Sequence, residues 1–284
     1  AAYISAMRGH RVTLFDRRPE LGGQINLAVK IPGKQEFFET LRFYQVMLEK
    51  YGVELKLGQT VDAETLNSGA FDLVVLATGV KPRELELDGI DHPKVLSYLD
   101  VLDKERVVGQ KVAVIGAGGI GIDVAHFLTA QTPFSGEVPE YLQGYGILDS
   151  EKALALRKPK KREVTVLQRS ADKIGKRLGK TTGWAHIQTL KSHGVQLLPG
   201  ATYLKIDDSG LHVRVALKKG EEPKDIVFEV DNVIVAAGQE PRRELETSLR
   251  KAGFEVHVIG GAKAALGLDA KTAISDGAEL AAKL

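Results

Sequence analysis

The stretch that decides the fold is Lys111-Val-Ala-Val-Ile-Gly116-Ala-Gly118-Gly-Ile-Gly121, in which an apolar strand ends in a glycine loop. A helical segment over 119–130 follows at once, and this context raises the Gly-x-Gly-x-x-Gly pattern above coincidence. The first glycine permits the turn, the second lets backbone approach a pyrophosphate, and the third lets helix pack on strand. We therefore predict a dinucleotide site at Gly116, Gly118, Gly119, Ile120 and Gly121. The alternative is a glycine-rich turn without a ligand.

The tip of the next strand, over 163–168, indicates which dinucleotide would bind. An Asp or Glu there would accept hydrogen bonds from a free ribose hydroxyl, whereas an arginine would pair with a 2′-phosphate. This chain has Gln168-Arg169-Ser170, followed by Lys173, Lys176 and Arg177. The sequence therefore predicts NADPH, with Gln168 and Arg169 in the site. Merely solvated lysines are the alternative, and we prefer that interpretation for Lys158, Lys160 and Lys161.

Two segments depart from this unit. Gly121 and Gln168 lie much further apart than the roughly 20 residues expected before the ribose-reading position. Residues 131–160 are therefore predicted to leave the unit as an excursion. Residues 201–230 alternate in polarity between turn-forming segments, which predicts a small antiparallel meander.

The chain carries the nucleotide-binding pattern twice. The run 71–79, followed by Pro82-Arg83, is echoed by the run 232–238, followed by Pro241-Arg242. Self-similarity at this scale indicates two related units. The first unit opens at 1–7, which is typical of the remainder of a helix that a glycine loop would start. We therefore expect a strand and a glycine loop upstream, and expect residues 1–284 to belong to a longer chain.

Strands and helices alternate in both units, which predicts an α/β fold with a parallel, doubly wound sheet. Expected elements include strands at 12–15, 53–57 and 256–259, a helix over 35–50, and a final helix that Asp269 caps. The order of elements makes the second unit an insertion. We expect residues 1–105 and 240–284 to form one domain, and residues 106–239 to form the other.

Asp16 ends a strand of the first unit, and its carboxylate suits the adenosine ribose of a flavin dinucleotide, which has no 2′-phosphate. The contrast between Asp16 and Arg169 assigns FAD to one unit and NADPH to the other. The backbone of the loop 21–24 would run along the flavin, and residues 60–61 would meet the adenine through main-chain groups. Small residues at two strand ends would allow domains and nucleotides to approach closely. Each could singly be an ordinary turn. The predicted contacts are Asp16, Arg17, Gly23, Gln24, Val61, Ala77, Thr78, Gly79 and Gly238.

Composition narrows the function classes further. The 284 residues are 43% hydrophobic, with a net charge of +2 and no cysteine. The chain can therefore bury a substantial core, and disulfides, thiolate catalysis and thiolate-held clusters are excluded within it. The charge gives no case for nucleic-acid binding, and no apolar run approaches the roughly 20 residues of a membrane span. A cytoplasmic protein is expected.

No catalytic or metal-binding side chain stands out in the sequence. The seven histidines lack metal-ligand spacing and a nucleophile partner, so we interpret them as structural. Trp184 could line the nicotinamide side of a cleft between the domains, or it could be a core or interface residue, and the sequence does not decide among these positions.

Several longer runs together resemble bacterial NADPH-dependent 2,4-dienoyl-CoA reductase, a flavoenzyme similar to trimethylamine dehydrogenase. They are Leu21 to Gln24, Asp88 to Asp100, Gly116 to Asp123, Gln168-Arg169, Lys180 to Trp184 and Ala237 to Pro241. The match spans nearly the whole chain and corresponds to the C-terminal reductase portion. It implies two nested Rossmann-like domains of the glutathione reductase type. It also implies that NADPH reduces FAD here, and that a preceding FMN barrel with a 4Fe-4S cluster reduces the dienoyl thioester in unsaturated fatty acid β-oxidation.

The resemblance also implies individual contacts. Asp16, Gln24, Lys34 and Val61 match FAD-contacting positions, and Gly261 and Asp269 lie where the chain would meet the flavin ribityl and ring. The family usually places an aspartate after Gly260-Gly261, whereas this chain has Ala262-Lys263. A non-catalytic domain holding ADP is a second hypothesis, which the trimethylamine dehydrogenase resemblance permits. A flavin disulfide reductase would need the cysteine pair that this chain lacks.

Overall fold

The structure is a computed structural model that describes residues 1–67, 69, 71–130, 162–176, 178–179, 181–216 and 220–284. The expected excursion at 131–160 lies outside these residues. The chain forms two compact units: unit 1 is Ala1–Arg83 with Gln239–Leu284, and unit 2 is Glu84–Gly238. No helix among the described residues is long and apolar enough to cross a membrane.

Unit 2 is built on one parallel sheet of five strands in the order β5-β12-β6-β7-β8. The strands are β5 (Val95–Ser97), β6 (Lys111–Ile115), β7 (Glu163–Leu167), β8 (Gln196–Leu198) and β12 (Asn232–Val235). The central strand β6 pairs with β7 on one side and β12 on the other. Its residues 113–115 are fully buried, which explains the unbroken apolar run that the sequence shows there.

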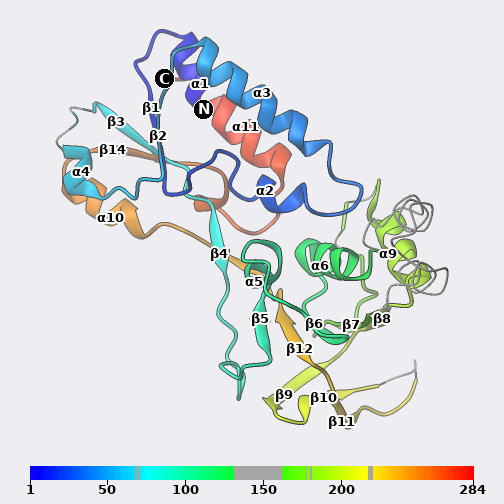
Figure 1. The fold of residues 1–284 in the computed structure, drawn as a ribbon. Helices are drawn as coiled ribbons and strands as arrows, with labels where there is room; N and C mark the ends of the chain where they lie inside the picture. Colours follow the sequence, from blue (N-terminus) through cyan, green and yellow to red (C-terminus); the bar gives the residue numbers. More distant parts are fainter. Residues whose placement is uncertain (68, 70, 131–161, 177, 180, 217–219) are drawn as a thin grey trace, which may run out of the picture. The chain divides into compact units, whose positions relative to one another are not determined.

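The two faces of this sheet are covered differently. The helices of unit 2 are α5 (Tyr98–Leu102), α6 (Gly119–Thr129) and α9 (Gly183–Ser192). The antiparallel meander consists of β9 (Thr202–Asp207), β10 (Gly210–Val215) and β11 (Lys224–Phe228), and it supplies Ile206, Leu211 and Val213 to a core with Ile115 and Leu167. Figure 1 shows the meander on one side of the sheet and α6 on the other.

The first boundary of the compact units differs from the sequence-based boundary near residue 105. Strand β5 pairs in parallel with β12, so the segment that contains it is part of the sheet of unit 2. Helix α5 follows at once and packs on α6. It begins with a capping box in which Ser97 and Asp100 bond each other's backbone N–H groups. The segment 84–105, which the sequence-based boundary assigned to the first domain, therefore contributes to the core of unit 2.

Unit 1 contains shorter pieces of sheet. Strand β1 (Thr13–Asp16) pairs in parallel with β2 (Glu54–Leu57), and β3 (Leu73–Leu76) pairs in parallel with β14 (Glu255–Val258). A third pair, β4 (Val80–Pro82) with β13 (Gln239–Pro241), is antiparallel. Among the described residues, no strand joins β1 to β3. Phe15 of β1 and Phe71, which precedes β3, lie edge to face with their ring centroids 6.0 Å apart.

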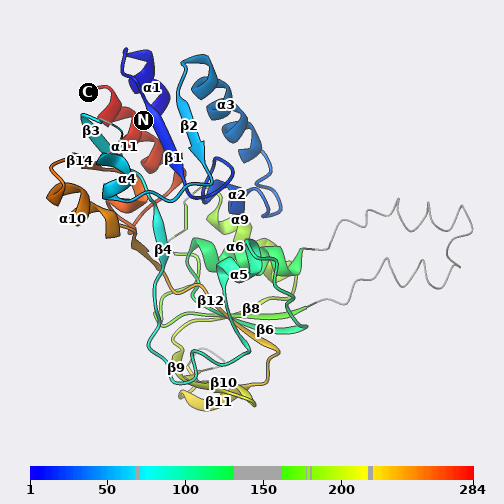
Figure 2. The ribbon, with the colours of Figure 1, turned by 60° about the vertical axis from the view of Figure 1, so that its left-hand side comes forward.

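The helices of unit 1 complete its core. They are α1 (Ala2–Met7), α2 (Ile25–Ala28), α3 (Phe37–Lys50), α4 (Ala63–Asn67), α10 (Glu244–Lys251), α11 (Ala270–Ala281) and the short 3-10 helix η1 (Gly260–Ala262). Leu66, Leu76, Leu249 and Val256 form a buried cluster from α4, β3, α10 and β14. Figure 2 shows α1 beside α11, with α3 nearby. The α/β fold predicted from the sequence is confirmed.

Candidate dinucleotide-binding sites

Two glycines of the loop after β6 are required by the protein itself. Gly116 has φ +109°, and a Cβ there would stand 2.4 Å from the carbonyl oxygen of Ala236. A Cβ on Gly121 would stand 1.8 Å from the carbonyl oxygen of Gly116. Both distances are far below van der Waals contact. The turn and the packing of α6 on β6 therefore depend on these two glycines.

The other two glycines have no such role. A Cβ on Gly118 or Gly119 would meet no atom within 4 Å. Gly118 is the N-cap of α6, with no side-chain cap, and the first turn contains no acidic residue. The N–H groups at this helix start and the positive end of its dipole therefore face open space, which suits a bound pyrophosphate. The donor set fits a dinucleotide phosphate.

The turn after β7 presents an arginine without a carboxylate. Arg169 is exposed, and no ion pair to it or to Lys173 occurs among the described residues. Lys176 differs, because its Nζ lies 2.9 Å from Asp172 Oδ1. Gln168 does not face solvent freely, since its Nε2 donates to the carbonyl oxygen of Ser170 at 3.0 Å. The positions expected at 177, 158, 160 and 161 lie outside the described residues.

Packing holds this turn in place. A Cβ on Gly175 would stand 2.8 Å from Ile187 Cγ1, and Gly183 approaches Leu178 equally closely. The Tyr203 hydroxyl donates to the carbonyl oxygen of Leu167 at 3.1 Å. Burial raises the pKa of Tyr203 to about 12, and the charge of Arg169 opposes that rise. Arg169 therefore extends from a fixed support.

In unit 1, Asp16 occupies the position that corresponds to Gln168, and Arg17 the position that corresponds to Arg169, because the carbonyl oxygens of Asp16 and Gln168 accept equivalent hydrogen bonds from Gln59 and Ala201. Asp16 ends β1, and its Oδ1 accepts a hydrogen bond from the backbone N–H of Arg18 at 2.9 Å. Its carbonyl oxygen accepts from the N–H of Gln59 at 2.9 Å, which ties the end of β1 to the segment after β2. Arg17 is exposed. One carboxylate oxygen of Asp16 is thus held by a hydrogen bond, and the carboxylate has the fixed position that an acceptor for ribose hydroxyls requires.

The loop from Leu21 to Gln24 is held by Asn26. The Asn26 Nδ2 donates to the carbonyl oxygen of Leu21 at 3.0 Å, and a Cβ on Gly22 would stand 2.4 Å from Asn26 Oδ1. Gly23 has φ +52° and open space at its Cβ position, and Gln24 is exposed. This backbone can be approached closely, as predicted for a flavin contact.

Lys34 and Val61 are both partly buried. Val61 packs its side chain against the cluster of Leu66 and Leu76, so only its main chain remains for an adenine. The sequence predicted that main-chain role, which no contact here tests.

The strand ends at 77–79 and 238 meet a second segment. Thr78 Oγ1 donates to the carbonyl oxygen of Arg242 at 2.5 Å, and the Gly79 carbonyl accepts from the N–H of Arg242 at 2.9 Å. Ala77 and Thr78 are exposed, and Gly79 and Gly238 have φ +73° and +113°. A Cβ on Gly261 would stand 3.1 Å from the Gly79 backbone. Sequence reasoning did not single out Arg242, although the repeat of Pro-Arg in the two halves marked its place.

The segment after Gly261 is organised by a residue that sequence reasoning missed. Asp276 on α11 accepts from the Gly260 N–H at 3.0 Å and from Lys263 Nζ at 3.1 Å. The hydrogen bond from the Lys263 side chain is the main reason that the pKa of Asp276 is lowered. Asp269 caps α11, accepting from the Thr272 N–H at 2.7 Å, as predicted. Its carboxylate therefore lies at the helix end that was expected to face a flavin.

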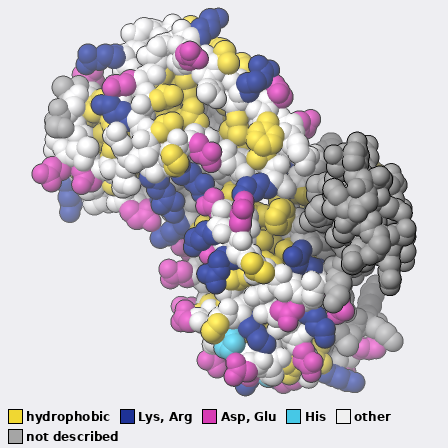
Figure 3. Space-filling model, viewed as in Figure 1, with side chains coloured by type: hydrophobic (Ala, Val, Ile, Leu, Met, Phe, Trp, Pro, Cys, Tyr) yellow, Lys and Arg dark blue, Asp and Glu magenta, His cyan; other side chains and the backbone are white. Residues whose placement is uncertain are grey.

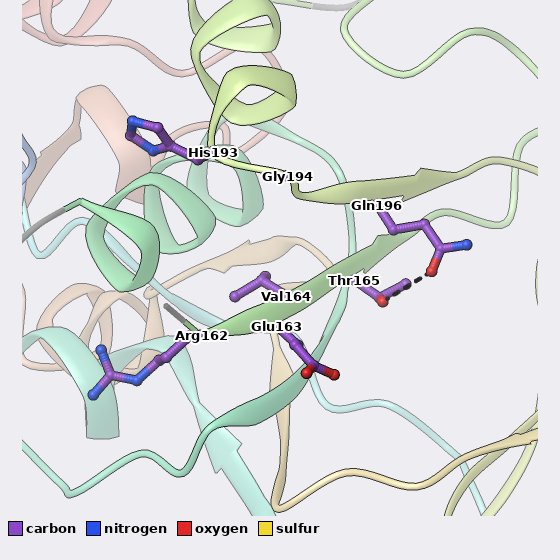
Figure 4. A pocket seen from close by; sticks show the side chains of 7 residues that line it. All are labelled: Arg162, Glu163, Val164, Thr165, His193, Gly194 and Gln196. Carbon is purple, nitrogen blue, oxygen red and sulfur yellow. Dashed lines mark hydrogen bonds between the residues drawn. The ribbon is translucent and has the colours of Figure 1, made fainter. Parts of the chain in front are cut away.

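Other candidate groups carry no site. A cavity of about 420 Å³ includes Arg162, His193 and Gln196 in its lining, and Figure 4 shows these side chains around the first residues of β7 and β8. That is the amino end of the sheet, opposite to the glycine loop, whereas ligands of open parallel sheets bind at the carboxyl end. No metal-binding group of His, Cys, Asp or Glu occurs among the described residues. Trp184 is 72% exposed, so the structure excludes a core position for it.

Comparison with known proteins places this geometry in context. The family profile described as pyridine nucleotide-disulphide oxidoreductase matches residues 1–266. A metal reductase of Desulforamulus reducens is 28% identical over 265 residues, which cover 92% of this chain and 39% of that protein. A cinnamate reductase of Clostridium sporogenes is 38% identical over 136 residues, covering 46% of this chain and 19% of that protein.

Solved structures agree with these relatives. A 2-naphthoyl-CoA reductase in complex with 2-naphthoyl-CoA matches 100% of this chain and 37% of its own, with 29% identity and a TM-score of 0.80. A histamine dehydrogenase from Rhizobium sp. 4-9 matches 99% of this chain and 41% of its own, with 19% identity and a TM-score of 0.74, which shows the shared fold. The chain thus spans about two fifths of the length of the relatives that it matches end to end.

Proposed function

Because the chain belongs to the pyridine nucleotide-disulphide oxidoreductase family, we propose that it is the portion of a 2,4-dienoyl-CoA reductase-like flavoenzyme in which NADPH reduces FAD. Unit 2 binds NADPH, and unit 1 binds FAD. The observation that carries the proposal is the contrast at two equivalent strand tips. Unit 2 has the uncharged Gln168 where unit 1 has the carboxylate of Asp16, and the adjacent Arg169 is exposed and without a carboxylate partner among the described residues. A 2′-phosphate suits the first tip and a free ribose the second.

The residues of unit 2 bind and orient rather than react. The loop at Gly118 and Gly119 leaves room for a pyrophosphate at the start of α6. The fixed turn then brings the guanidinium of Arg169 to a phosphate through charge-assisted hydrogen bonds. When bound, the nicotinamide supplies a hydride and the flavin accepts it, so the chain contributes placement. The disulphide step in the family's name has no residue here, because the chain contains no cysteine.

The rest of the proposal concerns the whole enzyme. The 2-naphthoyl-CoA reductase match, at 29% identity over the full chain, supports an acyl-CoA thioester as the final electron acceptor. We extend this to a dienoyl-CoA, to an FMN barrel with a 4Fe-4S cluster as the partner domain of the same polypeptide, and to cytoplasmic fatty acid β-oxidation. Dienoyl-CoA should then accelerate NADPH oxidation by the enzyme. Failure of this acceleration while FAD is still reduced would remove the substrate assignment and leave the reductase role.

The test of cofactor choice is Arg169→Gln, compared with Lys176→Gln in the same turn. Loss of charge-assisted bonds to a phosphate should weaken NADPH binding roughly 10- to 100-fold. Binding of NADH should change by less than about 2-fold, since it has no 2′-phosphate. Lys176→Gln should leave both affinities nearly unchanged, because Lys176 is held by Asp172. Isothermal titration measures all four values, and equal losses for NADPH and NADH in Arg169→Gln would reject the assignment.

A non-catalytic, ADP-holding role is the competing hypothesis. The open helix start at Gly118 and the exposed Arg169 speak against it, because an ADP holder has no need of a second dinucleotide site. Heat release of the nucleotide from the purified protein separates the two. Absorbance in the flavin band supports the reductase role, and a released nucleotide with adenine absorbance alone supports the ADP holder.

A further inference from the structure

Arg242 is the residue whose position remains unexplained by the fold. It follows β13 directly, and two hydrogen bonds fix its backbone. Its N–H donates to the carbonyl oxygen of Gly79, and its own carbonyl oxygen accepts from the Thr78 hydroxyl. Its side chain leaves a buried Nε without a hydrogen-bond partner among the described residues. The backbone is thus held firmly, the side chain is half-buried, and one nitrogen of the guanidinium group, Nε, lacks an acceptor.

The surrounding cations are satisfied. Figure 3 shows Lys and Arg side chains gathered, with acidic ones among them, over the region where β4 lies in Figure 1. Three cations close to Arg242 in the sequence or on the paired strand β4 hold carboxylates: Lys81 with Glu244 at 3.2 Å, Arg83 with Glu240 at 3.8 Å, and Arg243 with Glu246 at 2.5 Å. Within the described part of the chain, Arg242 has no carboxylate at ion-pair distance. It adds only a minor contribution to the lowered pKa of Glu244, behind a backbone hydrogen bond and Lys81.

A guanidinium in this position calls for an acceptor from outside the fold. Arginine stays protonated in proteins, so it cannot escape the cost of burial by losing its charge. A buried donor without an acceptor destabilises the chain that carries it. Planar, bidentate donors are matched by phosphate and carboxylate oxygens. The missing acceptor is therefore best supplied by an anionic ligand.

The place of Arg242 identifies that ligand. Thr78 and Gly79, to which its backbone is bound, directly follow β3 at the carboxyl end of a parallel pair, where nucleotides bind. Gly79 leaves open space beside its backbone. We infer that Arg242 is a positioning residue that binds a diphosphate oxygen of the dinucleotide held by unit 1. This inference rests on the proposed function, in which that dinucleotide is FAD.

The test compares Arg242→Met with Arg243→Met, its paired neighbour. Both variants keep an unbranched side chain and lose one charge, so net charge is matched. Fluorescence titration should show FAD binding weakened roughly 10- to 100-fold in Arg242→Met. Riboflavin, which has no phosphate, should bind within about 2-fold of its wild-type affinity. Arg243→Met should keep FAD affinity within about 3-fold.

The melting temperature distinguishes a binding role for Arg242 from a structural role, because the two roles predict changes of opposite sign. After removal of nucleotide, Arg242→Met should melt at the same temperature as the wild type or higher, because a buried donor without an acceptor has been removed. A melting temperature lowered by several degrees would overturn the inference. Arg242→Lys provides a second variant, which keeps the charge but not the planar donors, and FAD should bind it with intermediate affinity.

The failures of the two proposals can be distinguished. If wild-type protein binds FAD and Arg242→Met binds it equally well, Arg242 has no such role and the proposed function stands. Equal weakening of FAD and riboflavin would also reject a diphosphate contact. If wild-type protein binds no FAD, both proposals fall.

Discussion

Units 1 and 2 share an order of strands but differ at the centre of the sheet. In unit 2, β6 joins β7-β8 to β12-β5 and carries the glycine loop at its end. In unit 1, the equivalent pairs β1-β2 and β3-β14 occur, and no strand joins them among the described residues. The difference shows that one strand supplies the sheet's continuity and also positions the glycine loop. The strand and loop expected upstream of unit 1 remain a prediction.

The largest expected effect is on hydrogen exchange. Along a strand in a parallel sheet, successive backbone amides point to opposite sides. Every amide of β6 therefore has a neighbouring strand to bond, whereas β1 and β3 each have a neighbour on one side only among the described residues. In a protein limited to residues 1–284, the outward amides of β1 and β3 should exchange on the order of 10³-fold faster than those of β6. Exchange measured by NMR or mass spectrometry checks this. Equal protection in the two units would break the comparison, since it would mean that the two edges are covered.

Glycine substitutions in unit 2 should separate folding from binding. Gly121→Ala forces a methyl group against the carbonyl of Gly116 and should cost about 2–4 kcal/mol of unfolding free energy. Gly118→Ala meets no protein atom, so stability should change by less than about 0.5 kcal/mol. Its added methyl should nevertheless weaken NADPH binding about 10-fold or more. Denaturant unfolding and NADPH titration of both variants test this. Wild-type stability together with wild-type NADPH affinity in Gly118→Ala would contradict the account.

A smaller effect is expected from the cap of α11 in unit 1. Asp269→Ala removes the acceptor for the Thr272 N–H and should cost about 0.5–2 kcal/mol. Asp269→Asn keeps an acceptor oxygen and should recover most of that loss. Thermal melts compare the two variants, and an equal loss in both would show that the charge matters rather than the cap.

The smallest effect concerns the capping box of α5 in unit 2. Burial raises the pKa of Asp100, but hydrogen bonds from Ser97 and Lys104 outweigh it and lower the pKa from 3.8 to about 2. A depressed folded-state pKa means that this stabilisation is present above the ordinary value and is lost as pH falls toward about 2. Asp100→Asn should remove that part of the acid dependence. If the melting temperatures of the wild type and the variant fall in parallel between pH 4 and pH 2, Asp100 does not contribute to the acid dependence of stability.

Much of unit 2 could be predicted because its signals are local. The apolar run of β6, the glycines after it and the alternating meander each determine structure within a few residues. The cap at Asp269 was equally visible. Arg169 was predicted as the tip residue, and its exposed position agrees with that role without testing it. The excursion at 131–160 stays untested.

What sequence reasoning missed depends on contacts between distant residues. Strand β5 enters the sheet of unit 2 by pairing with β12, far along the chain, and a short run such as 95–97 has too few residues to show a period. Asp276 acts through Gly260 and Lys263, which lie on another element. Arg242 differs from Arg243 in its buried Nε and in having no carboxylate at ion-pair distance among the described residues, and neither property can be read from two adjacent arginines in a sequence.

Anaerobic rapid mixing of the FAD-loaded protein with NADPH or NADH tests the central claim most directly. The claim is that Arg169 makes unit 2 a site for the phosphorylated dinucleotide and that unit 1 holds the flavin that receives its electrons. The account predicts that the flavin absorbance is lost about 10-fold or more faster with NADPH than with NADH at equal low concentration. Equal rates with the two dinucleotides, or no loss of absorbance with either, would contradict it.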